Sequence, residues 1–230
     1  MLGLSARAAG GKVYGAQLFG GAYEQFTSTG AHTAIAGLTA LDYLGMWGDP
    51  VNGHIISSSY QGLIDINPLT GTFRMIATNP GADGVTISPD GKIVYAEAGG
   101  NILAYSYATG ALLTTYSGNG HSPDGTGVIS GGKLSGDIVV NNNDGTVGLI
   151  DVNTGTETII ASGGNRGDFV SPDTSNGTLF LSQYNQVWRL SCGPDCSIGG
   201  GGGGGTGVPE PATLALFGLG LAALGLRRRR

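Results

Sequence analysis

A repeat with a period of about 40 residues constrains the fold of this chain more than any other feature. The dipeptide Thr-Gly recurs in register at 29–30, 70–71, 109–110 and 154–155, with spacings of 41, 39 and 45 residues. Each copy separates two short runs of apolar and β-branched residues, the pattern of two strands joined by a hairpin turn. A period in this range indicates one supersecondary unit used several times.

A second marker lies between the Thr-Gly copies. Ser88-Pro89-Asp90-Gly91 separates two strand-like runs, and Ser171-Pro172-Asp173 holds the corresponding place later in the chain. Each predicts a strand that stops at the proline, turns and starts again. One unit then contains four short antiparallel strands, which is the sequence form of one propeller blade.

The segment GVTISPDGKIVYAEAGGNILAYSYATGALLTTY (84–116) resembles bacterial propeller repeats of the YVTN and NHL type. The resemblance covers residues 54–190 well and residues 12–53 loosely, because 38–47 lacks a Ser-Pro-Asp-Gly turn. We predict an all-β fold over residues 12–190, a small propeller of about five four-stranded blades. Three complete units lie between three-stranded pieces at 12–36 and 168–190. The alternative is an incomplete propeller, an arc with exposed edge strands.

Composition supports this fold class and narrows the partners. Glycine is abundant, at 45 residues, and only 12% of the residues are charged. The net charge of −5 becomes −8 without residues 209–230, because four Arg and one Glu leave 7 basic and 15 acidic residues. An acidic domain without a basic patch predicts no nucleic-acid partner.

Residues 191–208 form the predicted linker. Seven consecutive glycines, 199–205, cannot pack and predict a flexible tether. Cys192 and Cys196 close a small loop just before them. Outside the cytoplasm we expect these cysteines to form a short structural disulfide, since a metal site would need two further ligands nearby.

The C-terminal residues form a three-part segment. Pro209-Glu210-Pro211 precedes an uncharged run at 212–226, and Arg227, Arg228, Arg229 and Arg230 end the chain. A helix of the uncharged run spans about 22 Å at ~1.5 Å per residue, against a hydrocarbon core of ~30 Å. The arginines resist translocation. The segment therefore predicts a short transmembrane helix with the preceding domain outside and the arginines as a cytoplasmic stop.

This tail, residues 208–230, resembles the PEP-CTERM sorting signal of Gram-negative bacteria. The resemblance implies a substrate of an exosortase-type transpeptidase, cut near Pro209, Glu210 and Pro211. It implies transit through the inner membrane and then the cell surface or extracellular matrix. The same kind of tail occurs on unrelated cargoes, including ice-binding proteins, so it indicates destination and not ligand.

The first eleven residues are expected to be a remnant of a signal peptide or a disordered start. Ala6-Arg7-Ala8 has the small-x-small form of a signal-peptidase site. We hypothesise that Met1 lies inside the signal peptide and that the mature chain begins near Ala9. A genuine Met1 in peptide mass mapping of native protein would exclude this hypothesis.

Motifs for catalysis are absent from the sequence. It contains no H-E-x-x-H, G-x-S-x-G or P-loop motif, and His32, His54 and His121 lie in different units. The stretch 121–125 (HSPDG) is expected to be a loop. Asn142-x-Asp144-Gly145 resembles part of a calcium loop, but a hairpin turn accounts for it without metal. We therefore expect no catalytic residues, no metal and no cofactor.

Two functions from different classes remain. The first is a non-enzymatic binding protein that recognises exopolysaccharide or an envelope protein through propeller loops. The alternative is a secreted metal-dependent propeller hydrolase or lyase of the lactonase kind. That alternative requires three or more candidate ligands to converge; the candidates are Glu97, Asp65, Asp151, Asn142 and His54.

The tail generates a testable prediction. Glu210→Gln should leave membrane insertion intact but block maturation, because the apolar run and the arginines are unchanged. Replacing all four arginines by Gln should instead release uncut protein, because the charge that resists translocation is lost. Fractionation and mass spectrometry in a host with an exosortase distinguish the two. Normal processing of the Glu210 variant would mean that the tail is a plain anchor.

Overall fold

The computed structural model describes residues 6–7, 12–16, 22–27, 29–38, 43–78, 80–173, 177–184 and 186–191. The chain divides into two units, Met1–Gly200 and Gly201–Arg230, and all of the described residues belong to the first. The predicted disulfide and sorting tail lie outside the described residues. Within the described part of the chain, no helix has the length and apolar character that a membrane crossing requires.

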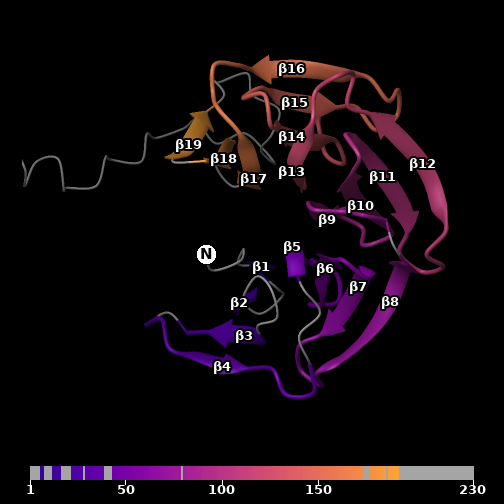
Figure 1. The fold of residues 1–230 in the computed structure, drawn as a ribbon, viewed down its shortest axis with the longest axis vertical. Coiled ribbons are helices and arrows are strands. Elements are labelled where there is room, and N and C mark those ends of the chain that lie inside the picture. Colours follow the sequence, from indigo (N-terminus) through magenta and orange to yellow (C-terminus); the bar gives the residue numbers. More distant parts are fainter. Residues whose placement is uncertain are drawn as a thin grey trace, which may run out of the picture. The chain divides into compact units, whose positions relative to one another are not determined.

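Five antiparallel sheets make up the described unit (Figure 1). The first contains β1 (Ala6–Arg7), β2 (Val13–Ala16), β3 (Tyr23–Phe26) and β4 (His32–Ala34). The second contains β5 (Tyr43–Gly48), β6 (Ile55–Ser59), β7 (Gly62–Asn67) and β8 (Thr72–Thr78). The third contains β9 (Val85–Ile87), β10 (Ile93–Ala98), β11 (Asn101–Ser106) and β12 (Leu112–Ser117). The fourth contains β13 (Pro123–Val128), β14 (Ile138–Asn142), β15 (Val147–Ile150) and β16 (Glu157–Ala161). The fifth contains β17 (Gly167–Asp173), β18 (Thr178–Gln183) and β19 (Gln186–Ser191).

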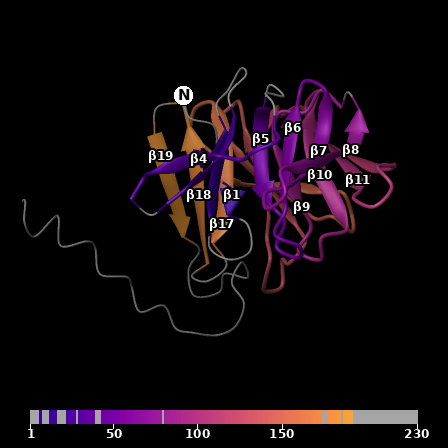
Figure 2. The same ribbon diagram turned by 90° about the horizontal axis from the view of Figure 1, so that it is seen from below.

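The sheets are the blades of a five-bladed propeller, and this prediction is confirmed. In every blade the strands pair in chain order, so each blade is a meander. The first strands contact one another in series, β1 with β5, β5 with β9, β9 with β13, and β13 with β17. These inner strands lie near the centre of the view in Figure 1, whereas β8, β12 and β16 lie at the periphery. Figure 2 shows the same blades from the side.

The Thr-Gly repeat marks the turn between the third and fourth strands, as predicted. Gly71, Gly110 and Gly155 have φ angles of 70°, 71° and 72°. Each donates its backbone N–H to the carbonyl four residues earlier, at 2.8–2.9 Å. A side chain at this left-handed backbone conformation is strained, which explains why glycine recurs there.

The two Ser-Pro-Asp segments differ from each other. Ser88 to Gly91 forms the predicted turn, closed by a 2.9 Å hydrogen bond from Gly91 N to Ser88 O. The expected stop at Pro172 is wrong, because β17 continues through Pro172 to Asp173 and pairs with β18. As an innermost strand, β17 has an unpaired edge in its own sheet, where a residue without N–H is tolerated.

The N-terminal sheet also begins earlier than residue 12, where the propeller was expected to start. Ala6 pairs with Tyr14 and Arg7 pairs with Val13, which makes β1 the inner strand of the first blade. The stretch that resembles a signal-peptidase site therefore overlaps a strand of the fold.

The hydrophobic core consists of four clusters, one between each pair of successive blades. The cluster between the second and third blades includes Ile56, Leu63, Val85, Val94 and Tyr105, and the other three have the same character. Because both faces of the middle blades are covered, β6 and β14 are fully buried. This explains why each begins with consecutive apolar residues, Ile55–Ile56 in β6 and Ile138–Val140 in β14.

Glycine allows the inner strands to approach closely. A Cβ on Gly45 would lie 2.5 Å from the carbonyl oxygen of Asp83 in the next blade. Gly84 meets Asp124 O in the same way, and Gly125 meets Asp168 O. In the fifth blade the equivalent position holds Phe169, whose ring lies 6.1 Å from that of Trp47 on β5.

This packing predicts a large effect of Gly125→Ala. The added methyl group would lie 2.7 Å from Phe169 Cα, and backbone cannot yield as a side chain can. We expect a loss of about 2–3 kcal/mol in the free energy of unfolding. Gly163→Ala is the matched control, because Gly163 has a φ of 91° but nothing within 4 Å of the added Cβ; it should lose about 1 kcal/mol. Urea unfolding of the full chain in mild detergent measures both, and equal losses would refute the argument.

Candidate functional site

Three aspartates occupy equivalent positions at the start of successive inner strands. Asp83 lies two residues before β9, and Asp124 and Asp168 are the second residues of β13 and β17. The backbone oxygen of each faces the inner-strand glycine of the preceding blade. The blade repeat therefore gathers three carboxylates at one end of the inner strands. We call these residues, together with Glu97, the axial acid cluster.

Glu97 joins this cluster from β10. Its backbone N–H donates to Gly84 O at 2.9 Å, and Asp83 N–H donates to Glu97 O at 3.0 Å, so the ladder between the strands holds it beside Asp83. Only 8% of its surface is exposed. Burial, followed by the charges of Asp83 and Asp124, raises the pKa of Glu97 to about 7.

The aspartates interact directly. Burial, followed by the charge of Asp83, raises the pKa of Asp124 to about 6. Burial also raises the pKa of Asp83, while a side-chain hydrogen bond with Asp124 opposes the rise. Two carboxyl groups that hydrogen-bond to each other share a proton, so the cluster holds protons close to neutral pH.

Arg166 is the cation that contacts this cluster. Its Nη2 lies 3.2 Å from Asp124 Oδ2, and its Nε donates to Asn143 Oδ1 at 3.1 Å. Its side chain is 65% exposed, whereas that of Asp124 is 8% exposed. Arg166 therefore covers the cluster from the solvent side and can move away without disturbing the core.

Unpaired hydroxyl groups lie near the same place. Thr126 and Thr86, on β13 and β9, are 2% and 0% exposed, and their Oγ1 atoms have no hydrogen-bond partner. Thr126 Oγ1 lies 3.4 Å from the Cβ position of Gly84. Buried polar groups usually have partners, so unsatisfied ones often mark a missing ligand or water.

The five metal-ligand candidates from the sequence do not come together. Glu97 belongs to the axial acid cluster, whereas Asp151 lies in the turn before β16, where its carboxylate accepts from Asn153 N at 2.8 Å. Asn142 ends β14 and donates to Thr146 Oγ1 at 3.0 Å. Only His54 and Asp65 contact each other.

Asp65 is the centre of a separate polar group that joins the second and third blades. His54 Nδ1 lies 2.7 Å from Asp65 Oδ1, and Arg74 Nε and Tyr107 Oη donate to Asp65 Oδ2 at 2.9 and 2.7 Å. Arg74 also lies over the Tyr107 ring, 4.4 Å from its centroid. Each oxygen of this buried carboxylate is occupied, so the group is a structural clasp.

The sequence did not single out Asp83, Asp124 and Asp168. The expectation of a loop at 121–125 is wrong for Pro123 to Gly125, which belong to β13. The available signal was an acidic residue before a glycine at equivalent points of two units, Asp83-Gly84 and Asp124-Gly125, followed by Asp168-Phe169 in the next.

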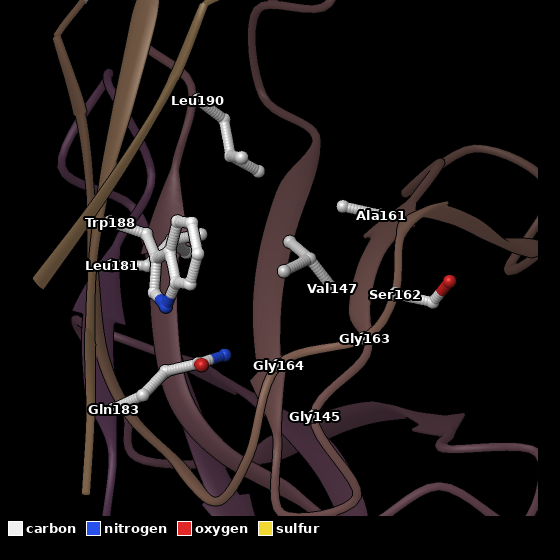
Figure 3. A pocket seen from close by; sticks show the side chains of 10 residues that line it. All are labelled: Gly145, Val147, Ala161, Ser162, Gly163, Gly164, Leu181, Gln183, Trp188 and Leu190. Carbon is white, nitrogen blue, oxygen red and sulfur yellow. The ribbon is translucent and has the colours of Figure 1, made fainter. Parts of the chain in front are cut away.

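Two cavities lie away from the acid cluster. One, of about 120 Å³, lies between the fourth and fifth blades, where Trp188, Leu181 and Val147 face one another beside Gln183 (Figure 3). The other, of about 330 Å³, is lined by Gln25, residues 33–36 and residues 68–71. The first is small compared with ligand pockets of ~300–1,000 Å³. Neither cavity is lined by a charged side chain, whereas the acid cluster holds four carboxyl groups.

In the described ranges, no three His, Cys, Asp or Glu side chains are arranged to hold one ion. In the axial acid cluster, Arg166 Nη2 already pairs with Asp124 Oδ2 at 3.2 Å. The cluster as it stands does not fit a bound metal.

Residues 207–230 match the family model of the PEP-CTERM protein-sorting motif. The chain carries a PEP-CTERM sorting signal. The predicted motif residues Pro209, Glu210, Pro211 and Arg227–Arg230 lie within this match, although outside the described residues, as do Cys192 and Cys196. The signal supports an exported protein that crosses the membrane and is processed by an exosortase. No curated protein matches the chain.

Solved structures share the fold of this PEP-CTERM chain. A gluconolactonase from Xanthomonas campestris has a TM-score of 0.68 and 15% identity, over 83% of this chain and 71% of that one. An auxiliary nutrient binding protein from Bacteroides thetaiotaomicron has a TM-score of 0.61 and 13% identity, over 82% and 59%. At these identities the likeness concerns the fold alone. The two similar structures are those of an enzyme and of a binding protein.

The acid cluster predicts how stability depends on pH. Glu97 has a raised pKa in the folded state and ~4.3 in the unfolded state, so the folded protein binds more protons between these values. Stability should therefore fall as the pH rises from about 4.3 to 7. Glu97→Gln should reduce this slope and stabilise the protein at pH 8, on the order of 2 kcal/mol, while Asp124 and Asp83, whose pKa values are also raised, keep part of the slope.

Thermal melts of the full chain between pH 4.5 and 8 test this prediction. Glu24→Gln is the matched control, because Glu24 lies on β3 beside His32, 3.1 Å away, and has no contact with the acid cluster. A slope as steep in Glu97→Gln as in the unchanged protein would show that Glu97 does not contribute to it.

Proposed function

We propose that the chain is an exported, non-enzymatic binding protein of the cell surface or extracellular matrix, and that the axial acid cluster binds a positively charged ligand. The observation that carries the proposal is the gathering of Asp83, Asp124 and Asp168 at equivalent ends of the inner strands, where Glu97 joins them from β10. Like charges placed together are costly unless a cation offsets them. Here the exposed side chain of Arg166 covers the site, and a ligand cation can take the place of its guanidinium group.

The ligand class follows from the donors that are needed. Ammonium groups donate several hydrogen bonds to carboxylates, and hydrogen bonds to charged groups contribute about 1.5–3 kcal/mol each. Both an amino-sugar polymer of the matrix and a lysine-rich envelope protein present such groups in series. The shared chemistry is a chain that bears ammonium groups.

Calorimetry with hexalysine and with a glucosamine hexamer tests this proposal, using the full chain in detergent. Binding should be lost with the N-acetylated form of each probe, which keeps the size and removes the charge. Asp124→Asn should weaken binding about tenfold, and Asp151→Asn, an equal charge change in an exposed turn, should not. For hexalysine, affinity should rise from pH 6 to 8 as Glu97 deprotonates.

Arg166→Gln supplies the sharpest contrast. If Arg166 competes with the ligand for Asp124, its removal should tighten binding. A role for Arg166 in holding the fold alone would instead leave binding unchanged or weaker. Equal affinity of the acetylated probes, or no effect of Asp124→Asn, would exclude the cluster as a cation site.

A hydrolase is the second candidate, and one observation favours it: the similarity of the fold to that of a gluconolactonase. The described acid cluster does not fit a metal, so we derive no reaction from it. Hydrolysis of glucono-δ-lactone by the chain, abolished by EDTA and by Glu97→Gln, would replace the binding proposal.

A further inference from the structure

The cavity of about 330 Å³ lies between the first and second blades, where their shared apolar core ends. In the first blade Tyr14 pairs with Gln25, and Gln25 pairs with Thr33. Residues directly opposite each other on paired strands lie on the same face of a sheet. Gln25 and Thr33 therefore lie on the face of Tyr14, which is buried in the cluster between these two blades. They form the polar outer end of that face and line the cavity.

The Thr-Gly turn of the second blade forms the opposite wall. Asn67 Oδ1 accepts hydrogen bonds from Leu69 N at 2.9 Å and from Thr70 N at 3.3 Å, which holds the turn in one conformation. The turn also lies against the first blade, since Ala36 O occupies the place that a Cβ on Gly71 would take. These contacts shape the wall without any ligand, and a wall formed in advance lowers the cost of binding.

The next interface in the ring shows which side chains this cavity lacks. On β7 and β8 Asp65 pairs with Arg74, as Gln25 pairs with Thr33 on β3 and β4. Thr33 precedes Arg74 by 41 residues, the spacing of the Thr-Gly copies in these two blades. Arg74 extends from its strand to Asp65 and to the third blade. Thr33 has a short, neutral side chain at the equivalent place, so this part of the space stays open.

Pro68 leaves the rest of the space open. It stands two residues before Thr70-Gly71, as Tyr107 stands two residues before Thr109-Gly110. Tyr107 crosses to the second blade and donates its hydroxyl to Asp65 Oδ2 at 2.7 Å. Pro68 has neither the length nor the hydroxyl for this contact. The clasp between the second and third blades thus becomes a cavity between the first and second.

The polar groups of the cavity are neutral and available. Among the described residues, none hydrogen-bonds to the side chains of Gln25 and Thr33. The amide of Gln25 offers two donors and an acceptor, and the hydroxyl of Thr33 both donates and accepts. The lining contains no charged side chain, and Pro68 and Leu69 add apolar surface, with Leu69 79% exposed. The lining therefore suits a ligand that combines hydroxyl groups with an apolar face.

We propose that this cavity binds a neutral sugar ring of a polysaccharide. A pyranose carries hydroxyl groups that donate and accept, which match Gln25 and Thr33, and its C–H faces match Pro68 and Leu69. A charged ligand would lose hydration without gaining an ionic partner. The volume lies within the range of small-ligand sites, ~300–1,000 Å³. The site shares no residue with the axial acid cluster, so it goes beyond the cation site proposed above, and the two are tested separately.

Saturation-transfer NMR of the full chain in mild detergent tests the proposal. The probes are the methyl pyranosides of glucose, galactose and mannose, and at least one should receive saturation from the protein. Hexalysine, the probe of the acid cluster, should not displace it. Displacement would mean that the sugar binds at the acid cluster, and no transfer to any of the three probes would overturn the proposal. Absence of hexalysine binding, in contrast, would count against the cation site alone.

Variants locate the bound sugar. Gln25→Ala should weaken binding about tenfold, because it removes the amide that meets the hydroxyl groups. Gln61→Ala is the matched control, since Gln61 is exposed in the turn after β6 and does not line the cavity; its Kd should equal that of the unchanged protein. An unchanged Kd in Gln25→Ala would overturn the proposal.

A second variant fills the cavity. Gln25→Asp, Thr33→Arg and Pro68→Tyr together introduce the side chains of the clasp at the equivalent positions. This triple variant should lose sugar binding, and thermal melts should show that it remains folded. Sugar binding retained by the folded triple variant would mean that the sugar lies elsewhere and would overturn the proposal. Gln25→Ala decides the matter by itself if the triple variant unfolds.

Discussion

The close approach of neighbouring inner strands at glycine underlies the rest of this structure. At Gly45, Gly84 and Gly125 the backbone of one blade meets the backbone carbonyl of an acidic residue in the next. A methyl group there would push the blades apart and open the apolar clusters between them. The same contact fixes the position of Asp83, Asp124 and Asp168. Packing and acidic chemistry therefore depend on the same three glycines.

Several buried carboxylates lower the stability of this fold when they are ionised. Glu97 and Asp124 are buried where their charged forms are disfavoured, and no buried lysine or arginine among the described residues neutralises them. Glu157, at the start of β16, repeats this conflict at a second place, because burial raises its pKa as well. Asp65 shows the alternative solution in the same protein, since His54, Arg74 and Tyr107 occupy both of its oxygens. The contrast separates carboxylates whose hydrogen bonds hold the fold together from those that remain available to bind a ligand.

Local features of the sequence predicted most of the fold. The Thr-Gly period and the Ser88-Pro89-Asp90-Gly91 turn predicted hairpins because they depend on backbone conformation within a few residues. Pro172 misled the prediction, since a proline ends a strand only where its missing N–H is needed, and an innermost strand does not need it. Asp124 and Glu97 could not be joined by local reasoning, because their proximity arises from the packing of separate blades. His54 and Asp65, two of the expected metal ligands, do contact each other, but within a hydrogen-bonded group that joins two blades.

Phe169 also limits how many blades of this kind can be joined in series. A gene that lengthens by tandem duplication adds blades whose inner strands must accept the next copy, and glycine at this position permits that. The fifth blade has a phenylalanine there, packed against Trp47. A sixth blade joined in the manner of the earlier ones would collide with that ring. An added blade that docked as the earlier ones do would therefore need glycine at residue 169.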